Sequence, residues 1–242
     1  MVTKTQKAPT RSRNRQKGPQ DEPPVSTLAT LSDQAYRKVL AGLFDRTVPA
    51  GAFVSQKTLI DLLDVPLQPL RDALRVLEAE GIVTIHPRSG IQFLQPDMQF
   101  VHNTYQFRSL IERAAARRFA ETADDAVIAQ LIDAHNDLLS RLGEGNANDP
   151  DMLAEVGLLD QDFHAKLNAN LNNPLLQTAS RRLQNYVRLI QLDRRITRPY
   201  AMRTLREHLD ILEACAERNA DAAEQALVGH FQAALGRMMG GF

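Results

Sequence analysis

Four side chains that can bind a metal or transfer a proton stand out in the C-terminal half of the sequence. Asp160 and His164 are four residues apart, a spacing that places a carboxylate and an imidazole on one face of a helix. His208 precedes an aliphatic run, and His230 precedes Phe231. A single histidine on an apolar face is more often a core residue than a ligand. Four such groups on three predicted helices weaken that explanation.

Six helical segments are expected to position these residues. Beyond Pro96 the β-prone runs stop, and helical patterns follow at roughly 98–122, 124–143, 150–171, 173–195, 199–218 and 220–238. The breaks between them contain turn and capping residues, and two carry a proline where a first helical turn tolerates it. We therefore expect an all-helical antiparallel bundle over residues 97–242.

The preceding residues predict a different unit. Three short helices are indicated, the first from Leu31 with Ser32 or Asp33 as its cap, the second capped by Ser55, and the third ending at Gly81. Two β-prone runs, 82–85 and 91–94, follow with a turn between them. This order predicts a winged helix-turn-helix over residues 29–96, in a chain that is mainly α.

Composition limits the class of protein. The 242 residues contain 29 Lys and Arg and 29 Asp and Glu, and Cys215 is the single cysteine, which fits a reducing compartment. No apolar stretch is long enough for a membrane span, so a cytoplasmic location is expected. Residues 1–17 hold six basic residues and no acidic one. We interpret residues 1–28 as a flexible basic arm.

Residues 65–83 resemble the recognition-helix signature of GntR-type bacterial transcription regulators. The matching residues are Pro69, Arg71, Ala73, Leu74, the run from Leu77 to Gly81, and Gly90 in the wing. The resemblance implies a helix in the major groove of DNA and a wing tip in the minor groove. Where the family usually has Ser-Arg-Thr, this chain has Pro66-Leu67-Gln68. The DNA-binding residues are therefore predicted to be Leu67, Gln68, Arg71, Arg75, Arg88 and Gly90, with Gln68 suited to adenine and arginine to guanine or phosphate.

The C-terminal half resembles the FCD ligand-binding domain of the FadR branch of that family, in its smaller, VanR-like form with six helices. The pattern is an Asp followed by Phe-His, then two His residues 22 apart, here Asp160, Phe163-His164, His208 and His230. The resemblance implies a divalent metal held by Asp160, His164, His208 and His230, with zinc first and nickel, manganese or iron as alternatives. Arg108 matches an Arg-x-x-Leu/Ile-Glu motif of the domain. The resemblance implies that Arg108 binds the carboxylate of a small organic acid. The alternative is an arginine at the surface or paired with Glu112.

The expected function is a homodimeric, effector-responsive regulator of transcription, more often a repressor in this family, that reads an inverted repeat in double-stranded DNA. A rival is a helical metalloenzyme, because a metal with open positions can activate water. No second carboxylate or other base stands recognisably beside the four residues, so an enzyme is not predicted. A third reading is a protein-interaction adaptor with a degenerate winged helix.

Overall fold

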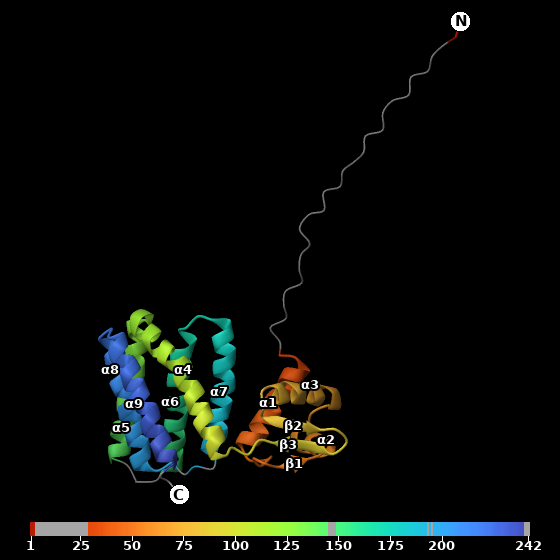
Figure 1. Ribbon diagram of the computed structural model, residues 1–242, viewed down its shortest axis with the longest axis horizontal. Coiled ribbons are helices and arrows are strands. Elements are labelled where there is room, and N and C mark those ends of the chain that lie inside the picture. Colours follow the sequence, from red (N-terminus) through yellow and green to blue (C-terminus); the bar gives the residue numbers. More distant parts are fainter. Residues whose placement is uncertain (3–28, 145–148, 193, 195, 240–242) are drawn as a thin grey trace.

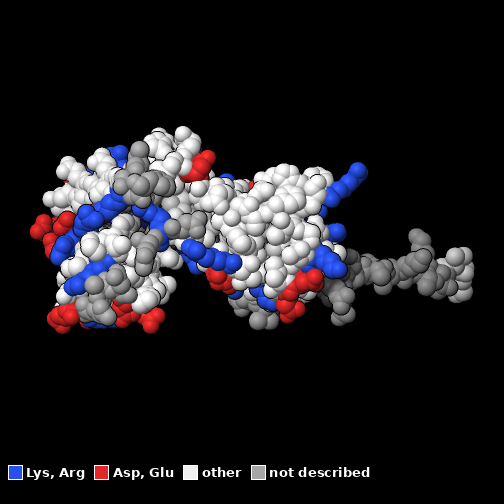
Figure 2. Space-filling model, turned by 90° about the horizontal axis from the view of Figure 1, so that it is seen from below, with Lys and Arg blue, Asp and Glu red and all other residues white. Residues whose placement is uncertain are grey.

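The computed structural model describes residues 1–2, 29–144, 149–192, 194 and 196–239. Apart from its first two residues, the predicted basic arm lies outside this part of the chain. The described residues form two lobes, a small N-terminal one and a larger helical one (Figure 1). Seen from below in Figure 2, basic side chains lie near the place where the two lobes meet. Within the described residues, no helix has both the length and the apolar character needed to cross a membrane.

The N-terminal lobe, called the head below, is a winged helix-turn-helix, as predicted. Its elements are α1 (Leu31–Phe44), β1 (Phe53–Val54), α2 (Gln56–Leu63), α3 (Leu67–Ala79), β2 (Val83–His86) and β3 (Gly90–Phe93). The strands form an antiparallel sheet in the order β1-β3-β2, in which His86 pairs with Gly90 at the wing turn. The sequence did not predict β1, because two residues are too few to show an alternating pattern.

The start of α1 differs from the prediction. Thr30 is the N-cap, and its hydroxyl accepts from the Asp33 backbone N–H, while the Asp33 carboxylate accepts from the Thr30 backbone N–H. This reciprocal capping box makes Asp33 the third helical residue, so neither Ser32 nor Asp33 is the cap. Ser55 caps α2 as predicted, through its hydroxyl and the Thr58 N–H.

The larger lobe, called the bundle below, contains the six predicted helices. They are α4 (Met98–Thr122), α5 (Asp125–Glu144), α6 (Pro150–Ala169), α7 (Pro174–Leu192), α8 (Arg198–Ala216) and α9 (Ala220–Met239). Each end lies within three residues of the predicted one. Phe119, Phe163, Leu212 and Leu227 are buried in its core. Helices α4, α8 and α9 pack against one another.

The two lobes share apolar packing through α7. In Figure 1 this helix stands on the side of the bundle that is nearest to the head. Leu189 of α7 is buried in the hydrophobic core of the head, beside residues of α1 and the sheet, and Tyr186 packs against the same core. Leu189 and Tyr186, two side chains of the bundle, therefore form part of the contact between the two lobes.

Candidate metal centre and DNA-binding surface

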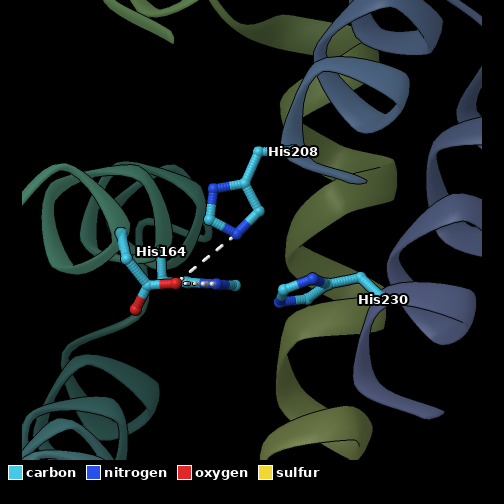
Figure 3. Close-up of side chains that lie close together, drawn as sticks. His164, His208 and His230 are labelled. Atoms are coloured by element: carbon cyan, nitrogen blue, oxygen red, sulfur yellow. Dashed lines mark ion pairs between the residues drawn. The ribbon is translucent and has the colours of Figure 1, made fainter. Parts of the chain in front are cut away.

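Three helices bring the four predicted ligands to one place. Asp160 and His164 come from α6, His208 from α8 and His230 from α9, and their ligand atoms all lie within 4.8 Å of one another. Asp160 Oδ1 is 3.5 Å from His208 Nε2 and 3.8 Å from His164 Nε2. Figure 3 shows the imidazoles of His164, His208 and His230 lying close together and coming from different helices. The spacing on α6 explains part of this geometry, since residues i and i+4 share a helix face.

Each imidazole is oriented by a partner on its other nitrogen. His164 Nδ1 is 2.5 Å from Glu112 Oε2, His230 Nδ1 is 2.9 Å from Glu207 Oε2, and His208 Nδ1 is 3.2 Å from His135 Nε2. Such outer partners fix the ring orientation of metal-binding histidines. Because these partners bind the Nδ1 atoms, the Nε2 atoms remain for a metal at the centre of the cluster.

Two of those Nε2 atoms have no hydrogen-bond partner. His164 Nε2 and His208 Nε2 are both buried and unpaired among the described residues. Leaving a buried polar atom unpaired costs about 1–3 kcal/mol, so two of them side by side need an explanation. A divalent cation would supply it, because imidazole nitrogen and carboxylate oxygen are ligands of zinc and its neighbours. The donor set therefore fits a metal.

Burial also favours the protonation state that binds a metal. Burial lowers the pKa of His208 well below its usual value, and the nearby His230 and His164 lower it further. Burial likewise lowers the pKa of His230, although its hydrogen bond to Glu207 opposes the shift. Neutral imidazole is the form that coordinates a metal, so no proton has to leave these two side chains at neutral pH.

Arg108 lies beside the cluster but is paired with Glu112. Its Nε donates to Glu112 Oε1 at 2.7 Å, and both side chains are almost fully buried. Burial raises the pKa of Glu112, but Arg108 and His164 outweigh that effect and bring the pKa to about 2. The sequence left open whether Arg108 would be paired in this way, and the structure shows that it is. Arg108 also lines a small pocket with Glu112, Asp160, Gln161, His164, Gln184 and Val187.

Sequence reasoning missed the three partner residues. The expectation that no second carboxylate lies beside the ligands is wrong, because Glu112 and Glu207 each contact a histidine of the cluster. Glu207 directly precedes His208, and Glu112 is four residues after Arg108, so both had a local signal. His135 had none, since α5 approaches α8 only in the folded chain.

The predicted DNA-binding residues form two groups on the head. Leu67, Gln68, Arg71 and Arg75 are exposed on α3, while Arg88 and Gly90 lie at the wing turn. Gln68 Nε2 donates to Asp72 at 3.0 Å, and Arg71 Nε donates to Gln56 at 3.2 Å. Pro66 is the N-cap of α3 and makes no side-chain cap. The first backbone N–H groups of α3 are therefore available to a phosphate.

A winged helix with an exposed recognition helix, joined to a helical bundle with a buried Asp and His cluster, is the architecture of a DNA-binding protein with a second, all-helical domain. Comparison with known families is specific. The family described as bacterial regulatory proteins, gntR family, matches residues 31–93, and the FCD domain matches residues 103–233. The chain belongs to the GntR family and carries an FCD domain, as in the FadR branch.

Curated relatives agree with this assignment. The chain is 28% identical to the transcriptional repressor RspR of Escherichia coli K12 over 213 residues, 84% of this chain and 86% of that one. It is 26% identical over 200 residues to the galactonate operon transcriptional repressor of the same strain, which covers 74% of this chain and 83% of that one. Relatives of this kind are transcriptional regulators and not enzymes. The protein is a DNA-binding transcriptional regulator, and the hypothesis of a helical metalloenzyme is wrong.

Solved structures share the fold. A GntR regulator from Rhodococcus sp. RHA1 superposes with a TM-score of 0.70 at 22% identity, covering 87% of this chain and 98% of that one. McbR/YncC of E. coli gives 0.69 at 17% identity, covering 88% and 100%. Both lobes are thus common to these regulators.

Proposed function

We propose that this protein is a metal-containing transcriptional repressor whose binding to its operator is modulated by a small organic acid. The observation that carries the proposal is the set of four ligand atoms within 4.8 Å of one another, two of them buried nitrogens without a partner. Zinc is the first candidate for the metal, because three imidazoles and one carboxylate suit it. Nickel, manganese and iron accept the same donors.

The acid would bind to the metal and to Arg108. Four protein ligands leave open positions on a five- or six-coordinate ion, and a carboxylate oxygen can fill them. Arg108 borders the same pocket, and its bond to Glu112 uses one of the five donors of a guanidinium. The position of the Arg108 guanidinium beside this pocket supports a role in holding the carboxylate of the acid.

The operator would be an inverted repeat read by a homodimer. A single recognition helix touches few bases, and a two-fold dimer places two such helices on two half-sites. Leu67, Gln68, Arg71 and Arg75 would contact bases and phosphates in the major groove, with Arg88 and Gly90 at the minor groove. The names of RspR and of the galactonate operon regulator support repression. A regulator bound to bacterial DNA acts in the cytoplasm.

Selection of binding sites from random and genomic DNA tests the operator, at about physiological salt where non-specific binding is weak. A short inverted repeat is the expected product. Gln68→Ala should change the preferred base at one position of each half-site, whereas Gln130→Ala, on an exposed face of α5, should leave the motif unchanged. Recovery of no motif overturns the proposal, and a complete lack of salt-sensitive DNA binding favours the protein-interaction adaptor.

Zinc titration tests the metal. We expect one zinc ion per chain in the wild type and no specific binding in His208→Ala, while the exposed His102→Ala variant binds as the wild type does. DNA affinity in His208→Ala should stay within a few-fold of the wild type, and its response to an acid should disappear. If His208→Ala binds zinc normally or still responds to the acid, the metal-mediated mechanism is wrong.

A further inference from the structure

Helix α7 has two functional faces. Gln184 and Val187 line the small pocket beside His164, while Tyr186 and Leu189 pack against the head. At 3.6 residues per turn, residues 184 and 187 lie on one side of the helix and residues 186 and 189 on the other. One rigid element therefore contacts both the candidate metal centre and the DNA-binding lobe.

The contact with the head is made at the end of the recognition helix. The Tyr186 hydroxyl donates to the backbone carbonyl of Glu80, the C-cap residue of α3. The Glu80 carboxylate accepts from the Tyr36 hydroxyl of α1 at 2.8 Å, and Asn185 Nδ2 donates to that hydroxyl at 3.3 Å. Carbonyls at the end of a helix lack partners within the helix. Helix α7 supplies one of those partners from the other lobe.

Apolar contacts make this junction stiff. Leu189 is 1% exposed within the core of the head, and the Tyr186 ring meets Phe100 at the start of α4 edge-on, with centroids 4.9 Å apart. A Cβ at Gly81 would lie 3.4 Å from the Tyr186 hydroxyl, so the chain approaches α7 closely where α3 ends. A shift of α7 cannot leave α3 in place without breaking these contacts.

The pocket has no room for an acid while α7 is in this position. Its volume is about 10 Å³, about the space of a single water molecule. Residues of α4, α6 and α7 line it. Helix α6 carries Asp160 and His164, and Glu112 of α4 is bound to His164. Helix α7, described along its whole length, provides neither a ligand of the cluster nor a partner of its histidines. Of the three helices that line the pocket, α7 is therefore the one that is not tied to the histidine cluster.

We propose that α7 is the transmission element of this regulator: filling the small pocket beside the candidate metal centre displaces α7, and the contact of Tyr186 with Glu80 carries the displacement to the recognition helix. The inference rests on the proposed function, since it gives the route by which an acid bound in that pocket regulates DNA binding. It also supplies what coupling requires, one element whose position both sites influence.

Hydrogen exchange on the full chain tests this route without knowledge of the operator. Metal-free protein is compared with protein holding Zn²⁺ and excess acetate, the simplest carboxylate probe. In the wild type we expect exchange to change by about fivefold or more both in α6, α8 and α9 and in residues 67–82. In Tyr186→Phe, which keeps the ring and removes the hydroxyl, the change in the bundle should persist and the change in residues 67–82 should be weaker than in the wild type.

Asn185→Ala provides a second variant should Tyr186→Phe fold poorly. Its matched control is Asn170→Ala, because Asn170 also donates hydrogen bonds, to Arg118 and Thr122, but within the bundle. Only Asn185→Ala should weaken the change in residues 67–82. An unchanged response in both junction variants overturns the route, as does a wild-type response confined to the bundle. No response anywhere means that the pocket takes no metal, and then the proposed function itself fails.

Discussion

At the scale of single residues, Glu112 links the buried Arg108 to a histidine of the cluster. One oxygen accepts from Arg108 Nε and the other contacts His164 Nδ1, and the residue is 3% exposed. The Arg-x-x-Leu/Ile-Glu motif contains this residue, but its contact with His164 joins positions 52 residues apart. Sequence spacing was enough to select Asp160, His164, His208 and His230 as candidate ligands, and the structure brings these four residues together. The outer partners depend on how helices pack, which no local pattern records.

Glu112→Gln should damage both stability and metal binding. The amide leaves the buried Arg108 without an ion pair, so we expect the free energy of unfolding to fall by about 3–5 kcal/mol. Zinc affinity should fall about 10- to 100-fold, because His164 loses the carboxylate that orients it. Urea unfolding and zinc titration measure the two effects.

Glu224→Gln is the control for that substitution. Glu224 pairs with Arg113 at 2.5 Å on a partly exposed surface, where an ion pair contributes about 0–1 kcal/mol. Its effect on unfolding should be small, and zinc affinity should not change. Equal losses in the two variants would contradict the central role given to Glu112.

At the scale of elements, the helices were predictable and the smallest features were not. Helical periodicity, together with Pro174 and Pro199, predicted the ends of all six bundle helices to within three residues. The cap of α1 was misplaced because Thr30, Ser32 and Asp33 can all cap a helix, and only the backbone geometry decides among them. Strand β1 pairs with β3 across a long sequence distance and is recognisable only in the sheet.

Gly81→Ala should weaken the end of α3. Gly81 has φ +76°, a conformation that a side chain disfavours, and the new Cβ would contact the Tyr186 hydroxyl at 3.4 Å. We expect a loss of about 1 kcal/mol or more in the free energy of unfolding.

Gly157→Ala should have the opposite effect. This glycine lies inside α6 with open space around it, so alanine should raise the free energy of unfolding by about 0.5–1 kcal/mol. Thermal unfolding of both variants gives the signs, and a neutral Gly81→Ala would refute the argument.

At the scale of the whole molecule, α4 exposes an apolar face, and we predict that the proposed homodimer forms there. Leu110 is 67% exposed and Phe107 is 44% exposed, three residues apart on that helix. A symmetric interface brings each residue near its own copy or a close neighbour, so a charge there is repeated in both chains. Leu110→Glu should therefore shift the protein toward monomer in sedimentation velocity. Leu175→Glu, at an even more exposed position on α7, should stay dimeric. A dimer that tolerates Leu110→Glu would have its interface elsewhere.

The sequence predicted the two lobes, but it did not predict the contact that α7 makes between them. Leu189 lies more than 90 residues beyond the last strand of the head, and its apolar character fits a bundle helix equally well. Arg108 shows the same difficulty within one lobe, since the sequence allowed either a surface position or the pair with Glu112.

The position of Leu189 also bears on how regulators of this kind can be recombined. A side chain of the bundle completes the core of the head, so the head is not an independent module. A chimera that joins this head to the effector domain of a relative would expose the apolar site that Leu189 fills, unless the partner supplies a side chain of similar shape. Successful exchange of DNA specificity between relatives should therefore require that the head-facing residues of α7 be transplanted together with the head.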